Sequence, residues 1–213
     1  MVELLNKLNG KNRRGFTLIE MLVVIAVIAI LAGIIIGVLP AARNKAIRSA
    51  VTTDMKAVEM AIDNYKEKHN FYPPDNTKEP SRNALYYELT GTTNSNAGGT
   101  LEYYSLATHE ILKQNEVQGL FSIPGFSNTG AAEDESAVAN FYRGKTPRYR
   151  EMPSPGSGLP TYKALVAPRY GKDKELAVWN YVKTNPTNNV GEYDLWAEID
   201  IGGDKVIISN WEH

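Results

Sequence analysis

Hydrophobic and polar positions divide the chain into one long apolar run and a mixed remainder. Between residues 16 and 39 only Thr17 and Glu20 are polar, whereas polar and apolar residues mix throughout the sequence after residue 42. At about 1.5 Å per residue, a helix over this run extends about 36 Å, which exceeds the roughly 30 Å hydrocarbon core of a bilayer. The pattern therefore predicts a membrane-spanning helix.

A second helical pattern follows Pro40. Apolar residues recur at steps of three and four, and charged residues occupy the other faces. The sequence predicts that the helix continues, with room for a kink at Pro40, to about His69, where Pro73 and Pro74 prevent further helix. This apolar stripe, which is expected to face the core of a globular head, consists of Ile47, Val51, Met55, Val58, Ile62 and Tyr65.

The middle of the chain, residues 75–160, gives weaker signals. We expect short helices over residues 83–89 and 106–114. The Thr, Asn, Ser and Gly content of residues 91–100 predicts a loop, and the prolines of residues 146–160 predict an irregular surface segment. Any recognition specific to this protein is most easily accommodated in this middle segment.

The C-terminal part shows strand patterns. Residues 161–166 and 176–182 are rich in β-branched and aromatic residues, and residues 193–201 alternate between apolar residues and an acidic face that includes Trp196. We expect the middle segment to cover Trp196, the alternative being an interaction patch. Gly202 and Gly203 predict a tight hairpin before a returning strand. The fold class is therefore α+β, a long N-terminal helix packed on a C-terminal antiparallel sheet.

The charges before the apolar run predict its orientation. Residues 1–15 carry four basic residues against Glu3, a net charge of +3, so the N-terminus is expected in the cytoplasm and the remainder outside. A cleaved secretory signal is the alternative, but its apolar region spans only about 7 to 15 residues.

Composition excludes several functions. The 213 residues carry a net charge of -1, which gives no electrostatic basis for binding nucleic acid. The chain has no cysteine, and its three histidines lack metal-ligand spacing. No nucleophile motif or phosphate loop occurs, so an enzyme is not expected.

Glu20 is the exceptional residue, because a carboxylate within a membrane span is costly and indicates a functional role with a specific partner. The segment Lys11-Asn-Arg-Arg-Gly-Phe-Thr-Leu-Ile-Glu20, followed by the apolar run, resembles the N-terminal signal of type IV pilins and type II secretion pseudopilins. The resemblance implies cleavage by a prepilin peptidase between Gly15 and Phe16 and N-methylation of Phe16. It also implies that Glu20 neutralises the new amine of Phe16, largely between neighbouring subunits, during assembly.

The resemblance also gives a domain division and a set of partners. Residues 1–15 are expected to form the leader, 16–40 the transmembrane assembly helix and 41–213 a periplasmic head. The expected partners are further copies of the chain in a helical fibre, other pseudopilins, prepilin peptidase and the secretion platform of the inner membrane. Gly33, Gly37 and Pro40 are expected to allow close helix packing or local unwinding in the fibre. Gly37 occupies a position at which many relatives have proline.

Two further segments are similar to the major pseudopilin. These are residues 54–66 with the following Phe71-Tyr72-Pro73, and residues 185–195 with the terminal Ser209-Asn210-Trp211. That family binds calcium in a C-terminal loop, but here only Asp200 and Asp204 flank a short Gly-Gly turn. Such a turn does not readily gather six or more oxygen ligands, so neither a metal nor another cofactor is expected.

Three classes of function follow from the sequence. The expected function is a structural subunit of a type II secretion pseudopilus. The alternative is a type IV pilin that serves adhesion, motility or DNA uptake, and a membrane-anchored exported enzyme or binding protein is disfavoured. The apolar helix and its basic flank predict a single-pass protein of the bacterial inner membrane with a periplasmic head.

Overall fold

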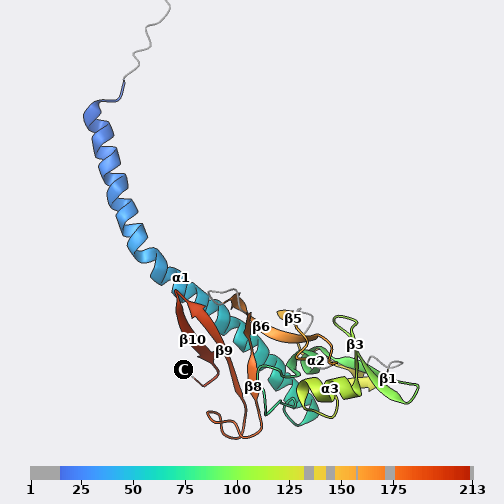
Figure 1. Cartoon of the computed structure of the whole chain (residues 1–213). Coiled ribbons are helices and arrows are strands. Elements are labelled where there is room, and N and C mark those ends of the chain that lie inside the picture. The colour runs from blue at the N-terminus through green and yellow to red at the C-terminus, as the bar shows by residue number, and fades with distance from the viewer. Residues whose placement is uncertain (1–14, 132–136, 143–146, 157, 171–175, 212–213) are drawn as a thin grey trace, which may run out of the picture. The chain divides into compact units, whose positions relative to one another are not determined.

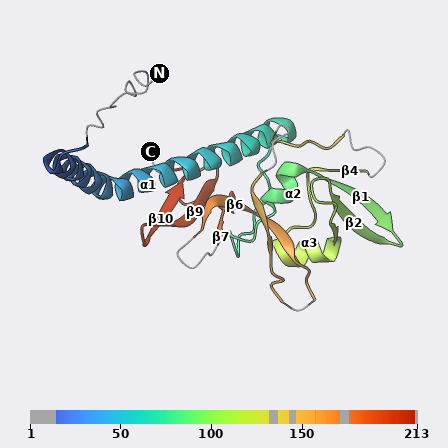
Figure 2. The same cartoon turned by 90° about the horizontal axis from the view of Figure 1, so that it is seen from above.

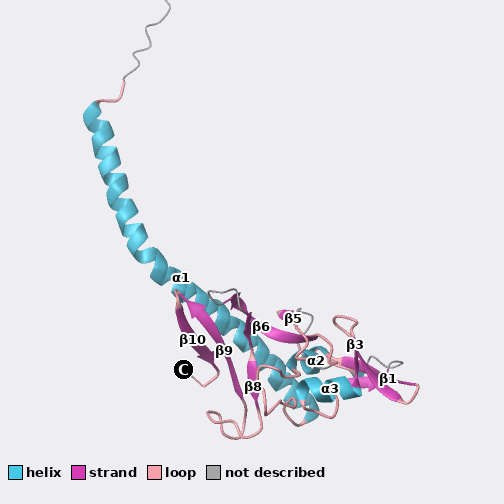
Figure 3. Ribbon diagram, viewed as in Figure 1, coloured by secondary structure: helices cyan, strands magenta, loops and turns pink. Residues whose placement is uncertain are grey.

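The computed structural model describes residues 15–131, 137–142, 147–156, 158–170 and 176–211. Most of the expected leader, residues 1–14, lies outside these ranges. The chain divides into two compact units, Met1–Arg43 and Asn44–His213. Figure 3 shows the secondary structure of the described residues.

Helix α1 (Leu18–His69) forms as the sequence predicts, and Pro40 lies inside it. The predicted end near His69 is confirmed: Asn70 adopts a positive φ of 63°, and its N–H donates to the carbonyl of Lys66 at 2.8 Å. Lys66, Lys68 and His69 in the last turn complement the partial negative charge at a helix C-terminus.

The apolar stripe of α1 is buried, as predicted. The exposed fraction of its side chains is at most 9%, at Ile47, and is 0% at Val51, Ile62 and Tyr65. Burial of each such side chain stabilises the fold by about 1.5–3 kcal/mol. The second half of α1 is therefore the element on which the head is built, and Figure 1 shows β8, β9 and β10 alongside it.

Three strands form the C-terminal sheet in the order β10–β9–β8: β8 (Asn180–Val182), β9 (Asp194–Ile201) and β10 (Asp204–Ser209). The predicted alternation along β9 is confirmed for its apolar side chains. Gly202 and Gly203, with φ of 72° and 102°, form the predicted turn. The acidic face differs at one position, because Asp194 is buried where a solvated carboxylate was expected. Trp196 is half-buried and packs against Trp211, with ring centroids 5.7 Å apart.

A second sheet has the order β5–β6–β7: β5 (Tyr149–Met152), β6 (Tyr162–Tyr170) and β7 (Leu176–Val178). The sequence predicted one strand over residues 176–182. Instead the chain changes sheets at Trp179, a fully buried residue whose backbone N–H donates to the carbonyl of Leu165 at 3.0 Å. Strand β5 also lies within residues 146–160, where only irregular structure was expected, because β6 supplies its backbone partner.

The third sheet lies in the middle of the chain, near helices α2 (Leu85–Thr90) and α3 (Gln114–Phe121) (Figure 2). Its order is β3–β2–β1–β4: β1 (Thr92–Ala97), β2 (Thr100–Ser105), β3 (Ile111–Lys113) and β4 (Thr129–Ala131). The predicted loop over residues 91–100 is wrong. Gly98 and Gly99, both with positive φ, turn the chain between β1 and β2, and β4 adds in parallel on the other side of β1.

The two predicted short helices had different outcomes. The helix expected at residues 83–89 is present as α2, whereas the prediction of a helix over residues 106–114 is wrong. His109 has a φ of 58°, which a helix cannot accommodate, and the N–H of Ser105 donates to the carbonyl of Glu110 across a turn. Strand β3 follows, and α3 begins only at Gln114.

The α+β class predicted from the sequence is confirmed. In the part of the chain that the structure describes, the expected single antiparallel sheet is instead three small sheets, because the long middle segment contributes strands of its own.

Candidate assembly site

Thr17 and Glu20 form a reciprocal cap at the start of α1. The carboxylate of Glu20 accepts the backbone N–H of Thr17 at 2.7 Å and its hydroxyl at 2.9 Å, while the N–H of Glu20 donates to the Thr17 hydroxyl at 3.3 Å. This is a capping box, in which the side chains at the N-cap and third helical positions satisfy backbone donors that lack helical partners. In the uncut chain the Glu20 carboxylate therefore has an intramolecular partner.

The predicted cleavage residues directly precede this cap. Gly15 and Phe16 are exposed, and the exposed fraction of the Phe16 side chain is 76%. The structure brings Glu20 together with Thr17. It does not pair Glu20 with an amine of Phe16, because the nitrogen of Phe16 is an amide before cleavage. The proposed Glu20–Phe16 pair thus stays a prediction for the processed chain.

Among the described residues of its own unit, none covers the apolar half of α1. Its large hydrophobic side chains are 45–83% exposed from Leu18 to Leu39. Among the described residues, α1 is the one helix long and apolar enough to cross a membrane. A contiguous apolar surface of this size indicates a lipid or protein environment.

Gly33, Gly37 and Pro40 all lie in α1, and the structure does not test their expected role in packing. A Cβ atom added at Gly33 would meet nothing within 4 Å, so this position is open to an approaching helix. Pro40 lacks the N–H that would donate to the preceding turn, which removes one helical hydrogen bond.

Asp200 and Asp204 flank the predicted turn between β9 and β10. The Asp200 carboxylate accepts the N–H of Gly203 at 2.8 Å, as is usual for an acidic residue in a tight turn. Among the described residues, no group of three or more Asp, Glu, His or Cys side chains is arranged to hold a metal ion.

Sequence reasoning missed a buried carboxylate in the head. Glu88 of α2 has no exposed surface and accepts hydrogen bonds from the Tyr65 hydroxyl at 3.0 Å and from the N–H groups of Ser127 and Asn128 at 2.8 and 2.9 Å. Burial raises the pKa of Glu88 to about 7, although these three hydrogen bonds favour the charged form. Glu88 thereby ties α1, α2 and the loop before β4 together.

Two further carboxylates organise loops rather than face solvent. Asp194 accepts the N–H groups of Thr187, Asn188 and Asn189 at 2.8–3.0 Å. The Asp75 carboxylate accepts the backbone N–H groups of Lys183 and Thr184 at 3.0 and 2.9 Å. The signal that could have revealed Asp194 is its position next to a loop rich in Asn and Thr, whose backbone donors need acceptors.

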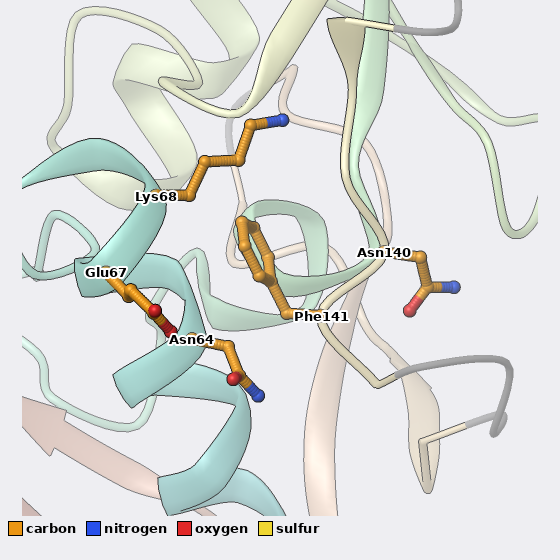
Figure 4. Close-up of a pocket in the computed structure, with 5 residues that line it drawn as sticks. All are labelled: Asn64, Glu67, Lys68, Asn140 and Phe141. Carbon is orange, nitrogen blue, oxygen red and sulfur yellow. The ribbon is translucent and has the colours of Figure 1, made fainter.

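A recess of about 370 Å³ lies between the end of α1 and residues 140–141. Figure 4 shows Phe141 pointing toward α1 and Asn140 pointing away from it. Lys68 spans the gap, and its ammonium donates to the carbonyl of Ala137 at 2.9 Å. The residues lining this recess are Asn64, Glu67, Lys68, Asn140 and Phe141.

A comparison with known protein families matches the N-terminal segment of the chain. The family described as the prokaryotic N-terminal methylation motif matches residues 10–36. No solved structure was found to match the chain significantly.

Curated relatives include proteins of two kinds. The type II secretion system core protein G of Pectobacterium carotovorum is 38% identical over 65 residues, which cover 30% of this chain and 42% of that protein. The protein of the same name from Escherichia coli is 39% identical over 64 residues, covering 30% and 44%. The chain thus spans less than half the length of these relatives. The type IV wide pilus major component PilA4 of Thermus thermophilus is 30% identical over 118 residues, which cover 49% of this chain and 90% of that protein.

Proposed function

Because this chain belongs to the type IV pilin-like family, which includes the type II secretion pseudopilins, we propose that it is a structural subunit of a type II secretion pseudopilus. The observation that carries this proposal is the exposed apolar half of α1 with Glu20 at its start. A helix of this kind can lie in lipid as a monomer and pack against identical helices in a fibre. The family is structural, and the proposal requires no catalysis.

We propose that the chain is cut between Gly15 and Phe16 and that Phe16 is then N-methylated. Cleavage leaves a cationic amine two residues before α1. In the assembled fibre, the carboxylate of Glu20 pairs with the Phe16 amine of a neighbouring copy in place of Thr17. This exchange compensates two charges that are costly to keep in an apolar environment, and it sets the register of each added subunit.

The proposed location follows from the same features. The apolar helix anchors the subunit in the inner membrane, with its basic N-terminal segment in the cytoplasm and the head in the periplasm. Its partners are further copies of itself, other pseudopilins, prepilin peptidase and the membrane platform of the secretion system.

One observation favours a type IV pilin as the second candidate. The similarity to the wide pilus component covers 90% of that relative, whereas the similarities to the core protein G of Pectobacterium carotovorum and of Escherichia coli cover 42% and 44% of theirs. The first segment of α1 does not separate the two candidates, because pilins and pseudopilins share it.

Two measurements test the proposal. Intact mass and N-terminal sequencing of the protein purified from its own membranes should show a start at N-methyl-Phe16. Deletion of the gene should abolish secretion of exported proteins and leave surface pili and twitching motility intact. Loss of pili with normal secretion would support the pilin instead, and an uncut chain that begins at Met1 would contradict both candidates.

A further inference from the structure

A pocket of about 390 Å³ lies within the head, beside the second half of α1. Its walls come from α1, from residues 142 and 147–148 before β5, from β6 and from the residue that follows β7. We call it the Trp179 pocket, and it is lined by Asp54, Ala57, Val58, Tyr142, Pro147, Arg148, Leu165 and Trp179. Small-ligand pockets have volumes of roughly 300–1,000 Å³ and combine apolar walls with a few polar groups, and this pocket has both properties.

Tyr142 brings a buried polar group without a partner to this pocket. The oxygen of its hydroxyl is buried and forms no hydrogen bond with any described residue. Burial and the nearby charge of Asp54 raise the pKa of this phenol. A buried hydroxyl without a partner lowers stability, and native proteins contain few of them. An occupant of the pocket would supply the missing partner.

Asp54 and Arg148 also have hydrogen-bonding capacity that the head does not use. The Asp54 carboxylate accepts one hydrogen bond, from the indole N–H of Trp179 at 3.2 Å. Its other oxygen lies 3.7 Å from Nε of Arg148, which is an ion pair too long for a hydrogen bond. A group placed between these two side chains can therefore donate to Asp54 and accept from Arg148.

The other walls of the pocket are apolar and are held by backbone hydrogen bonds. Val58, Leu165 and Trp179 are almost completely buried. The N–H of Val166 donates to the carbonyl of Arg148, and the N–H of Trp179 donates to the carbonyl of Leu165, both at 3.0 Å. The pocket is thus formed before any ligand arrives, which lowers the entropic cost of binding.

The two opposite charges determine which polar group fits best. Arg148 repels a cation that approaches Asp54, and Asp54 repels an anion that approaches Arg148. An uncharged amide avoids both penalties, because its N–H can donate to the carboxylate while its carbonyl accepts from the guanidinium. The hydroxyl of Tyr142 can add a further hydrogen bond. The apolar walls suit an aliphatic side chain attached to that amide.

The adjacent strand favours a polypeptide as the source of this amide. Strand β5 begins at the residue after Arg148 and is an outer strand of its sheet, so among the described residues its outer edge pairs with no other strand. An unpaired edge offers N–H and C=O groups to an extended chain. A peptide can use such groups, whereas a small molecule with a single amide cannot.

We propose that the Trp179 pocket binds one apolar residue of an uncharged stretch of another polypeptide, whose chain continues along the edge of β5. The backbone amide of that residue lies between Asp54 and Arg148, and its side chain lies against Val58 and Leu165. This activity goes beyond a structural role in a fibre. It needs only the head, so its failure leaves the proposed function untouched, and the reverse also holds.

The indole of Trp179 reports on the pocket directly, because its N–H donates to Asp54. The full chain, with isotopically labelled tryptophan, is placed in phospholipid nanodiscs and titrated with N-acetyl-leucinamide. We expect a saturable shift of the Trp179 indole signal in the NMR spectrum, with a Kd on the order of 1 mM for so small a ligand. Trp196 and Trp211 lie outside the pocket and should not shift, and their replacement by phenylalanine assigns the three signals.

Related probes test the chemistry of the ligand. Leucinamide is a cation, N-acetyl-leucine is an anion and free leucine carries both charges, and each should bind about tenfold more weakly than the neutral amide. Acetyl-glycyl-leucyl-glycinamide extends the chain on both sides and should bind about fivefold more tightly through added backbone hydrogen bonds.

Three variants test the residues. Arg148→Gln should weaken N-acetyl-leucinamide about fivefold and strengthen leucinamide, because it removes a donor and leaves the charge of Asp54 unopposed. Its side chain is 63% exposed, so the head should stay folded. Tyr142→Phe should weaken N-acetyl-leucinamide about threefold without lowering Tm, because the hydroxyl has no partner in the free head. Arg150→Gln, on β5 and outside the pocket, is the matched control and should leave Kd unchanged.

Several results would overturn the proposal. A Trp179 signal that does not saturate, or equal shifts of all three indoles, would show that the pocket is not a binding site. Charged leucine derivatives that bind as tightly as the neutral amide would contradict the assigned chemistry. A longer peptide that binds more weakly than N-acetyl-leucinamide would exclude a polypeptide as the ligand.

Discussion

Replacing Tyr65 by phenylalanine removes one hydroxyl from the centre of the head. The Tyr65 ring contacts His69 and Phe141, at centroid distances of 4.4 and 5.2 Å, and the variant keeps these contacts. What it loses is the hydrogen bond to the fully buried Glu88 carboxylate. A hydrogen bond to a charged group contributes about 1.5–3 kcal/mol, so we expect Tyr65→Phe to lower the free energy of unfolding by that amount when Glu88 is ionised.

This cost depends on pH. The pKa of Glu88 is raised to about 7 in the folded head from its ordinary value of 4.5. Between these values the folded state binds more protons than the unfolded state, so Glu88 makes stability fall as pH rises from about 4.5 to 7, by about 3 kcal/mol in total. Below the folded pKa of about 7, Glu88 is neutral in the folded head, and the hydroxyl of Tyr65 is worth only about 0.5–1.5 kcal/mol. The penalty of Tyr65→Phe should therefore be larger at pH 8.5 than at pH 5.5.

Urea unfolding of the full chain in mild detergent measures these differences, with the fluorescence of the buried Trp179 as the signal. Tyr72→Phe is the matched control, because its hydroxyl binds the exposed Lys66 and its loss should cost less than about 0.5 kcal/mol. Equal penalties for the two variants, or a Tyr65→Phe penalty that does not change with pH, would refute the account of Glu88.

Three other predictions concern the N-terminal helix, a loop and the turn between β9 and β10. Glu20→Ala should insert and be cleaved but yield few fibres, because the Phe16 amine loses its partner; a normal yield in sheared preparations would refute the assembly role. Asp194→Asn replaces an acceptor of three backbone N–H groups and should lower the free energy of unfolding by about 1–3 kcal/mol, and with it the urea midpoint, so an unchanged midpoint would show that the loop does not depend on Asp194. Calcium and chelators should leave Tm unchanged, because Asp200 and Asp204 offer too few ligands; a rise in Tm with calcium would reveal a site.

The elements predicted correctly are those with strong one-sided patterns. The stripe from Ile47 to Tyr65 and the alternation along β9 follow from burial of one face, which the sequence records directly. Strand β1 has no such pattern, because its Thr, Asn and Ser residues are held by pairing with β2 and β4. Its strand structure comes from partners distant in sequence, which composition cannot indicate.

The resemblance named Gly15, Phe16 and Glu20, and their roles in cleavage and assembly stay predictions. The capping box was missed even though Thr17 and Glu20 stand at the required spacing. Glu88 also had a signal, since it is the one charged residue in the run from Ala84 to Leu89.

Assembly of such a subunit needs polar contacts as well as apolar ones. Lipid tails are as apolar as the side chains of residues 18–39, so burial of apolar surface alone does not favour the fibre over the bilayer. The preference must come from packing and from groups that lipid satisfies poorly, and Glu20 is the one charged side chain in that segment. In the proposed fibre, adding a copy gives the Glu20 carboxylate a cationic partner, and this contact would select a helix that is stable in the membrane into the fibre.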